Sequence, residues 1–419
     1  MKPSPDRATD PGSLTADAAL ALAEALTEEM IERWRQGEHI LPEAYLDRFP
    51  GLREHPLAAA ELIYEEINLR AEYGLDVPTE HVIERFAQWR PQLEILFDCH
   101  RILSHRPAPR FPRAGEVIDD FRLLAKLGSG RLGRVFLASQ MPLADRHVVL
   151  KFTPWDALEY LTLARLQHPH IVPLYSVHNH PDCGLRSLCM PYHGGAVLSR
   201  LFALMRPTPP AERTAQTVLD ALDRTQAQAR SAGPPDRIVQ PASARGSYVQ
   251  AVCWIGARLA DALHYAHERN LIHLDIKPSN VLMAANGQPM LLDFHLAGEP
   301  FGPGRQRPYV FGGTPGYMSP EHRDALQAIR ESRPIERPVD ARSDVYSLGV
   351  TLYEALTGEL PTKSDDLKSV RRHNASVTTS LDDCVTACLA DDPAHRHRDA
   401  SALSVLLRQH AGDCVLGTH

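Results

Sequence analysis

The sequence predicts an α+β protein, in which a small all-α domain precedes a larger domain with a β-rich start and a helical remainder. Three observations support this fold class. Apolar residues recur at helical spacing across residues 13–104. Residues 104–114 then combine three prolines with arginines, a composition typical of a stiff, extended linker. After the linker, short β-branched runs come first and helical patterns follow, over about residues 121–410.

The bulk composition is that of a soluble globular protein, with 43% apolar and 23% charged residues in a chain of 419. A net charge of -7 without long like-charge blocks argues against a nucleic-acid-binding protein. No apolar run approaches the roughly 18–20 residues that span a bilayer, and Met1–Gly12 lacks the apolar core of a signal peptide. We therefore expect a cytoplasmic protein whose seven cysteines are free, mostly buried thiols.

Four helices are predicted in the first domain. One carries Leu22, Leu26, Met30 and Trp34 on a single side and ends near Gly37. The other three are expected to begin near Pro56, Thr79 and Pro91.

An internal repeat lies within this domain. Residues 43–49 (Glu-Ala-Tyr-Leu-Asp-Arg-Phe) resemble residues 80–86 (Glu-His-Val-Ile-Glu-Arg-Phe), 37 positions further on. Two imperfect copies are too few for a solenoid, so we interpret them as two related helical hairpins packed on one another. The domain carries no chemical motif. It either packs against the second domain or docks a regulatory partner.

Two segments of the second domain lie outside any catalytic pattern. Residues 206–246 contain six prolines around a polar helical stretch, which predicts a surface insertion. The series His178-x-His180-x-x-Cys183 is the nearest approach to a metal cluster. Strand-like runs flank it at 171–177 and 185–190, so a hairpin loop is the favoured interpretation, because structural zinc sites need four ligands.

The first chemical motif is a glycine-rich loop, Leu127-Gly-Ser-Gly-Arg-Leu-Gly-Arg-Val135. The spacing of Gly128, Gly130 and Gly133 alone also fits a dinucleotide fold. Here the following residues continue as a strand, so the loop is predicted to be the tip of a β-hairpin. Glycines at such a tip let backbone N–H groups approach phosphate oxygens.

A lysine and a glutamate form the second pattern. Lys151 ends the apolar run Val148-Val-Leu, and on its own it could be a surface lysine at a strand end. A helix is expected to start directly afterwards, with Thr153 as its cap and Pro154 in its first turn. Glu159 would then lie on that helix and hold the lysine.

Four more motifs follow. They are His273-Leu-Asp-Ile-Lys-Pro-Ser-Asn280, Leu291-Leu-Asp-Phe-His-Leu296, Gly313-Thr-Pro-Gly-Tyr-Met-Ser-Pro-Glu321 and Ser343-Asp-Val-Tyr-Ser-Leu-Gly349. In this order and spacing, the six motifs resemble the protein kinase superfamily, and bacterial Hanks-type serine/threonine kinases in particular. The resemblance covers about residues 121–410 and implies a bilobal kinase fold, with a β-rich N-lobe and a helical C-lobe.

The resemblance also implies a catalytic machinery that uses ATP and Mg²⁺, with Mn²⁺ as a possible substitute. Asp275 would be the catalytic base, and Lys277 would neutralise charge on the transferred phosphate. Asn280 and Asp293 would hold the metal ion. Thr314 would bond with Asp275 and Lys277. Together, Lys277 and Thr314 favour serine or threonine over tyrosine as the acceptor.

Lys151, held by Glu159, would contact the α- and β-phosphates, beside Gly128, Ser129, Gly130 and Gly133. Leu127, Val135, Val149 and Leu282 would enclose the adenine, with Met190 as gatekeeper. The hinge would bind it through the Pro191 carbonyl and the His193 N–H and carbonyl. Elsewhere, Asp344 is expected to accept N–H groups of the catalytic loop, and Glu321 to pair with Arg396.

The sequence departs from the family pattern in three places. Leu274 stands where many kinases have the arginine that receives an activation-loop phosphate. No serine or threonine lies between Phe294 and Gly313, where Tyr309 is the only hydroxyl. His295 replaces the glycine that gives the segment its freedom to flip. Only eight positions separate Lys151 from Glu159, so we expect little room for the helix to swing outward.

These observations favour an active serine/threonine protein kinase acting on protein substrates without activation-loop phosphorylation. The alternative is a nucleotide-binding pseudokinase scaffold, in which His295 and Leu274 mark decayed catalysis. A small-molecule phosphotransferase fits less well, because residues 314–321 resemble a peptide-substrate platform.

Overall fold

In the computed structural model the chain divides into two compact units. One comprises Met1–Phe111 with His180–Leu185, and the other Pro112–Asn179 with Arg186–His419. The structure describes residues 37–72, 79–90, 111–130, 133–155, 159–230, 243–304, 312–331, 333–361 and 369–417, as well as 19, 22–23, 26–27, 29–30, 33–34, 75, 92–93 and 157. Most of the predicted linker, residues 104–110, lies outside this part of the chain.

Short helices around a core of their own form the first unit. They are α2 (Pro42–Arg48), the 3-10 helix η1 (Pro50–Glu54), α3 (Pro56–Glu72), α4 (Thr79–Arg85) and the 3-10 helix η2 (Ala87–Trp89). Pro56 and Thr79 begin helices as predicted, whereas α2 is not among the four predicted helices. Only residues 92–93 of the predicted fourth helix are described. The core includes Trp34, Leu46, Leu52, Leu62 and Phe86.

The internal repeat of the sequence is also a structural repeat. In each copy a helix of seven residues is followed by a phenylalanine and then by a 3-10 helix. Phe49 and Phe86 leave the helical conformation in the same way, with φ of -129° and -125°. Arg48 lies 5.0 Å from the centre of the Phe49 ring, and Arg85 lies 5.1 Å from that of Phe86. The same type of cation–π contact therefore lies at the C-terminal end of both helices.

A buried ion network joins the two copies. Glu66 on α3 has no exposed surface, and its carboxylate pairs with Arg85 and Arg70, each at 2.8 Å. Arg85, from the second copy, also donates to Glu43 of the first copy at 3.1 Å. Glu66 is the buried member of this network, and it relies on the two partly exposed arginines to balance its charge. The network therefore favours this one packing of the two copies.

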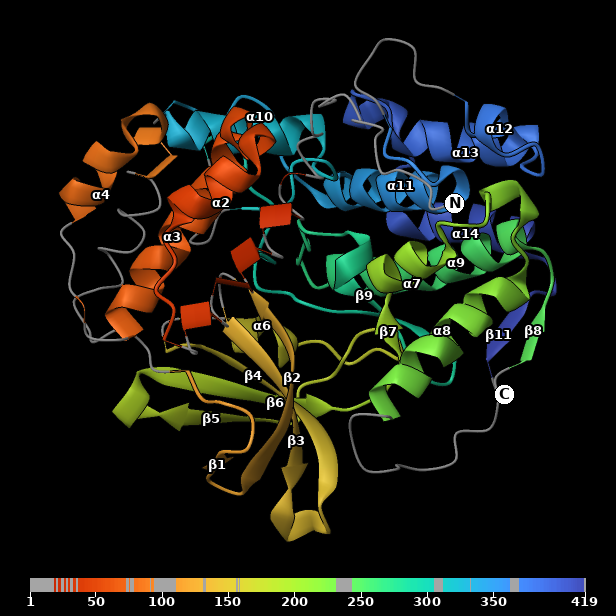
Figure 1. The fold of residues 1–419 in the computed structure, drawn as a ribbon. Helices are drawn as coiled ribbons and strands as arrows, with labels where there is room; N and C mark the ends of the chain where they lie inside the picture. Colours follow the sequence, from red (N-terminus) through yellow and green to blue (C-terminus); the bar gives the residue numbers. More distant parts are fainter. Residues whose placement is uncertain are drawn as a thin grey trace, which may run out of the picture. The chain divides into compact units, whose positions relative to one another are not determined.

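The second unit begins with a six-stranded sheet in the order β1-β2-β3-β4-β6-β5 (Figure 1). The strands are β1 (Val117–Ile118), β2 (Phe121–Gly130), β3 (Gly133–Gln140), β4 (Arg146–Pro154), β5 (Ser176–His180) and β6 (Leu185–Pro191). Gly130 pairs with Gly133, so the glycine-rich loop is the tip of a hairpin, as predicted. Along β4, Val148, Leu150 and Phe152 are buried inside the lobe. The residues between them, Val149 and Lys151, lie on the opposite face.

The helix after β4 begins later than the sequence predicts. Thr153 and Pro154 were expected to start it, and this is wrong, because both extend β4. The pairing of β4 with β3 continues through Phe152, and Thr153 is buried at the strand end, where its hydroxyl caps no helix. Strand pairing therefore overrides the local capping signal, and α6 covers only Glu159–Leu163.

The remainder of the second unit is mainly helical (Figure 1). Its helices are α7 (Leu198–Met205), α8 (Ala215–Arg230), α9 (Tyr248–His267), α10 (Pro320–Arg330), α11 (Ala341–Thr357), α12 (Val370–His373), α13 (Thr379–Cys388) and α14 (Ala400–Ala411). The strands β7 (Ala196–Val197), β9 (Val281–Met283) and β10 (Pro289–Leu291) form a small sheet, and β8 (Ser243–Arg245) pairs with β11 (Val415–Gly417). The long helix α9 packs against α11 and α14, which places the core around it.

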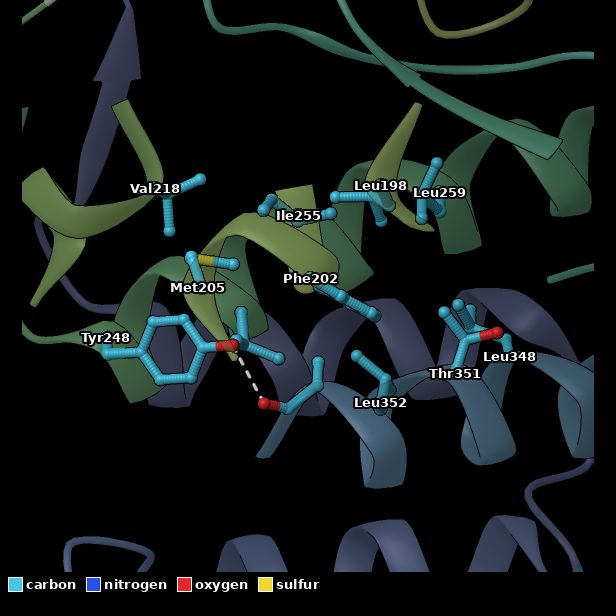
Figure 2. Close-up of a pocket in the computed structure, with 12 residues that line it drawn as sticks. Leu198, Phe202, Met205, Val218, Tyr248, Ile255, Leu259, Leu348, Thr351 and Leu352 are labelled. Atoms are coloured by element: carbon cyan, nitrogen blue, oxygen red, sulfur yellow. Dashed lines mark hydrogen bonds between the residues drawn. The ribbon is translucent and has the colours of Figure 1, made fainter. Parts of the chain in front are cut away.

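The helix α8 lies in the predicted surface insertion, but it also contributes to the core. Its residues Val218, Leu219 and Leu222 are buried. Figure 2 shows Val218 at an apolar cavity of about 20 Å³ that α7, α9 and α11 also line. At its edge the Tyr248 hydroxyl donates to the Ala355 carbonyl at 2.8 Å. The cavity holds about one water molecule at most, so it is a packing gap. Residues 231–242 of the insertion lie outside the described part.

Six cysteines lie in the described part of the chain, and all are free thiols. Burial raises the pKa of Cys253 to about 12 and that of Cys384 and Cys414 to about 11. These thiols therefore stay protonated and unreactive. Within the same residues, the structure has no helix whose length and apolar character would let it span a membrane.

We predict that a shortened chain beginning at Pro112 folds and binds nucleotide. The second unit has its own helical core and its own sheet, and the proline-rich residues 104–114 should be readily cut by proteases. Calorimetry with ATP–Mg²⁺ on the shortened and the full chain checks this. If the shortened chain is soluble and folded yet binds no nucleotide, the first unit is needed to complete the site.

Candidate active site

The loop between α9 and β9 is fixed by the buried carboxylate of Asp344. Asp344 lies on α11, has no exposed surface, and accepts the backbone N–H groups of His273 at 2.8 Å and Leu274 at 2.9 Å. His267 bonds to the same carboxylate at 2.8 Å. The predicted role of Asp344 is confirmed. Leu274 has a left-handed backbone (φ 66°), which costs about 1–2 kcal/mol for an L-residue. The two bonds therefore hold a strained turn directly before Asp275.

Asp275 is the centre of a closed hydrogen-bond network. Thr314 donates to its Oδ1 at 2.8 Å, and Lys277 donates to the Thr314 hydroxyl at 2.7 Å. The Lys277 ammonium lies 3.0 Å from Oδ2, to which the Asn280 amide also donates at 2.9 Å. Burial alone raises the pKa of Asp275, but Lys277 and Thr314 outweigh it and leave the pKa below its ordinary value. Asp275 is therefore an ionised acceptor.

Glycine at position 313 makes this network possible. Gly313 has a φ of 131°, and a Cβ there would lie 2.6 Å from the Met318 methyl and 3.1 Å from the Leu274 carbonyl oxygen. A side chain at this position would be strained by the positive φ and would press on the Leu274 carbonyl oxygen. The segment therefore passes close to the catalytic loop and brings Thr314 to Asp275.

A second polar chain crosses from the sheet to the helical lobe. The Lys151 ammonium donates to both oxygens of Glu159, at 2.9 and 2.7 Å, and to Asp293 Oδ1 at 2.6 Å. His295 Nδ1 bonds the same Asp293 oxygen at 2.7 Å. Burial raises the pKa of Asp293, but His295 and Lys151 reverse this and hold it far below its ordinary value. Lys151 stays protonated, because the two carboxylates raise its pKa despite burial.

Asn280 and Asp293 present oxygen donors that fit a magnesium ion. The Leu292 N–H donates to the Asn280 carbonyl at 2.9 Å, which makes Asn280 a neighbour of Asp293. The side-chain NH₂ of Asn280 faces Asp275, so its amide oxygen remains as the ligand end. An ionised carboxylate and an amide oxygen are ligands that Mg²⁺ prefers.

Four of the predicted nucleotide-binding residues of the sheet share one face. Val135 lies opposite both Gly128 and Lys151 in the register, and Val149 shares their face of β4. A Cβ at Gly133 would lie 2.2 Å from the Phe152 carbonyl oxygen, so only glycine fits there. Ser129 pairs with Arg134 and Gly130 with Gly133 in the hairpin, and Leu127 is 49% exposed.

The predicted adenine pocket continues at the end of β6. Met190 and Leu282 are half-buried against the same small apolar cluster, which contains Val172 and Met290. Pro191 ends the strand. The His193 carbonyl, predicted to serve the nucleotide, already accepts the Ala285 N–H at 3.1 Å. A carbonyl oxygen has two lone pairs. The Ala285 N–H therefore occupies one of them and leaves the other free to accept a hydrogen bond from a nucleotide.

The predicted pair of Glu321 and Arg396 is confirmed as a buried bidentate ion pair. Arg396 donates to both carboxylate oxygens at 2.7 Å, and Ser343 donates to one of them at 2.6 Å. Burial raises the pKa of Glu321, but these donors lower it to about 2. The pair ties α10 to the start of α11 and to the residues before α14, so it anchors the end of the segment that carries Thr314.

Sequence reasoning missed Arg186, which belongs to no motif. This buried arginine on β6 donates to the Ala157 carbonyl at 3.0 Å and to Asn179 at 2.9 Å. Its guanidinium also lies 4.1 Å from the centre of the Tyr160 ring. Ala157 and Tyr160 flank Glu159, so Arg186 holds the start of α6 from two sides. A charged residue inside an apolar strand-like run was the one available signal.

A family profile described as "Protein kinase domain" matches residues 245–406. The chain is 30% identical over 324 residues to serine/threonine-protein kinase PknB of Mycolicibacterium smegmatis, a match that covers 70% of this chain and 43% of that protein. It is 31% identical over 260 residues to the DNA damage-responsive serine/threonine-protein kinase RqkA of Deinococcus radiodurans, covering 60% of this chain and 31% of that protein.

These curated relatives are longer than the matched region, and the chain spans less than half the length of each. Among solved structures, the kinase domain of Mycobacterium tuberculosis PknI aligns with 72% of this chain and 100% of its own, at 22% identity and a TM-score of 0.46.

We predict that Arg186→Met weakens nucleotide binding about tenfold, because α6 has only five residues and loses the side chain that fixes its start. Hydrogen exchange of residues 157–163 should rise in the same variant. Arg165→Met is the matched control, since Arg165 is exposed just beyond α6. Equal nucleotide affinity in both variants would contradict a role for Arg186 in holding Glu159.

Proposed function

Because the chain belongs to the protein kinase family, as a domain of the bacterial Hanks type, we propose that it is a serine/threonine protein kinase that transfers the γ-phosphate of ATP to protein hydroxyls. The observation that carries this proposal is the closed network of Asp275, Lys277 and Thr314. Phosphoryl transfer needs positioned charges more than covalent chemistry. The polar groups that it needs are present, and losing one transition-state group would be a large rate cost.

Asp275 acts as the base in this proposal. Its carboxylate is ionised and buried at the end of a rigid turn, so it can accept the proton of a substrate hydroxyl. Lys277 lies beside it and would neutralise charge on the phosphate in transfer. Thr314 fixes both side chains, and this arrangement favours serine and threonine as acceptors.

Lys151 and Asp293 prepare the nucleotide end of the site. Glu159 holds the Lys151 ammonium at the face of the sheet where the glycine-rich hairpin ends, which suits the α- and β-phosphates. Asp293 and Asn280 would hold Mg²⁺, or Mn²⁺, which supplies charge neutralisation at the phosphates when bound. Leu127, Val135, Val149, Met190 and Leu282 would enclose the adenine beside the Pro191–His193 hinge.

The substrate is proposed to be a protein. The residues from Thr314 to Glu321 are anchored at both ends, by Asp275 and by Arg396, and form a ledge beside the base. Such a fixed ledge suits an extended peptide better than a small molecule. The first unit, whose two repeat copies carry no catalytic motif, is proposed to dock a regulatory partner.

We also propose that activation-loop phosphorylation is not needed. A phosphate can act as a switch only where positively charged side chains are placed to pair with it. Leu274 is buried in an apolar cluster at the position expected for that cation. The sequence between Phe294 and Gly313 offers no serine or threonine, and Tyr309 lies outside the described residues.

The alternative function is a nucleotide-binding scaffold with little transferase activity. One observation favours it, namely that His295 bonds the Asp293 oxygen that Lys151 also contacts. A metal ion would compete with both groups for this carboxylate. We prefer the enzyme, because His295 leaves Asp275, Lys277 and Thr314 untouched.

Asp275→Asn and Asp293→Ala should each abolish phosphate transfer and leave the fold intact. The first change removes the proton acceptor and the second a metal ligand, and neither residue belongs to an apolar core. The assay uses labelled ATP–Mg²⁺ with a generic basic protein, and thermal unfolding reports the fold. Wild-type turnover in Asp293→Ala would refute the metal assignment, and an inactive wild type would refute the enzyme.

His295→Gly should keep the transfer rate within about tenfold of wild type, equivalent to ~1.4 kcal/mol in the barrier. Asp293 still has Lys151 as a partner, so the change removes a restraint and not a ligand. His295→Asn, which keeps a hydrogen-bond donor, is the matched variant. An inactive wild type that His295→Gly restores would support the scaffold instead.

A further inference from the structure

An apolar cluster surrounds Leu274, directly before the proposed base. Leu274 is only 7% exposed, and it packs with Ile272 from the same loop and with residues from three other elements. Leu296 and Phe301 come from the segment after Asp293, Ala328 from α10, and Ile335 and Val339 from the loop between α10 and α11. We call Leu274, Leu296, Phe301, Ala328, Ile335 and Val339 the apolar clasp.

Backbone hydrogen bonds hold the same segment at two points. Gly298 exchanges two bonds with Ile272, at 2.8 and 3.1 Å. Phe301 exchanges two with Val339, at 3.1 and 2.8 Å. The segment is therefore paired with the loop before Asp275 through Ile272, and with the residues before α11 through Val339.

The backbones of the segment and of its neighbours approach closely. A Cβ at Gly302 would lie 2.9 Å from the Pro338 Cα, so a side chain there would force the two strands apart. A Cβ at Gly312 would lie 3.3 Å from a Leu296 methyl group. Gly302 therefore lies against the residue before Val339, and Gly312 lies against Leu296 of the clasp.

The loop that supplies Val339 is itself well anchored. Asp340 caps α11 by accepting the Arg342 N–H at 2.9 Å, and its carboxylate also pairs with the Arg342 guanidinium. Arg337 pairs with Asp324 on α10. Val339 therefore presents a fixed apolar surface to Phe301.

We propose that the apolar clasp holds the segment after Asp293 in its substrate-binding position, and that Phe301 and Val339 are positioning residues for phosphate transfer. This rests on the proposed kinase function and deepens it. In place of a phosphate and a cation, burial of apolar side chains fixes the segment. The residues between Glu321 and Asp344 supply three of the six clasp side chains, namely Ala328, Ile335 and Val339.

The clasp acts through the path from Leu274 to Thr314. The Leu274 carbonyl faces Gly313, and Thr314 follows with its bond to Asp275. A loosened clasp should therefore disturb the ledge for the protein substrate more than the nucleotide site, whose residues Lys151 and Glu159 lie on other elements. The expected signature is a higher KM for the protein substrate at nearly unchanged nucleotide affinity.

The test compares Val339→Ser with Val377→Ser. Both valines are buried, at 0% and 2% exposure, and each directly precedes the residue that caps a helix, α11 or α13. Only Val339 belongs to the clasp. In Val339→Ser, the amides of Gly298 and Phe301 should exchange hydrogen at least about tenfold faster than in the wild type. The KM for the protein substrate should rise about tenfold, whereas the nucleotide affinity should stay within about twofold of the wild-type value. Val377→Ser should show neither local change.

Phe301 supplies a second, independent pair of variants. Phe301→Leu keeps an apolar contact and should behave as wild type, whereas Phe301→Ser should match Val339→Ser. Exchange of Gly298 that is no faster in Val339→Ser than in Val377→Ser would overturn the proposal, as would equal losses of nucleotide and substrate binding. The exchange measurement needs no activity, so an inactive wild type would refute the enzyme and still leave the clasp tested.

Discussion

The carboxylate of Asp344 is the constraint on which the catalytic half of the structure depends. It is fully buried, which raises its pKa, but its contacts with His267 and His273 outweigh burial and leave the pKa below the ordinary value. A buried charge is costly unless its hydrogen bonds are made. Here those bonds hold Leu274 in a left-handed turn. The turn directs the Leu274 side chain into the apolar clasp and sets Asp275 among Thr314, Lys277 and Asn280.

Two kinds of interaction, one ionic and one apolar, hold the segments around that turn. The chain from Glu159 through Lys151 to Asp293 is ionic and links the sheet to the helical lobe. The apolar clasp has no charged member, and it holds the segment that leads to Gly313. Ionic contacts respond to phosphates and metal ions, whereas apolar burial does not. Under the proposed function, this division would let the nucleotide site respond to its ligands while the proposed substrate ledge stays fixed without a phosphate.

The sequence predicted the parts of the fold and site that its motifs mark, because the family resemblance assigns a role to each motif residue even where its partner is distant in the sequence. The glycine hairpin, the contacts of Lys151 with Glu159 and of Asp275 with Thr314, and the pair Glu321–Arg396 all follow from motifs in order. Thr153 and Pro154 failed as a helix start, because pairing with β3 decides the conformation there. Arg186 and Val339 were missed because neither belongs to a motif, and nothing in the sequence marks an arginine beside a helix start or a valine paired with a phenylalanine.

The central claim is that the catalytic arrangement is built into the unphosphorylated chain. The most direct test is the rate of phosphate transfer by protein prepared with a phosphatase, measured before and after autophosphorylation, with modified residues mapped by mass spectrometry. The account predicts rates that agree within about twofold, a barrier difference below ~0.5 kcal/mol. A large increase in rate that maps to residues 294–313, Tyr309 included, would contradict it.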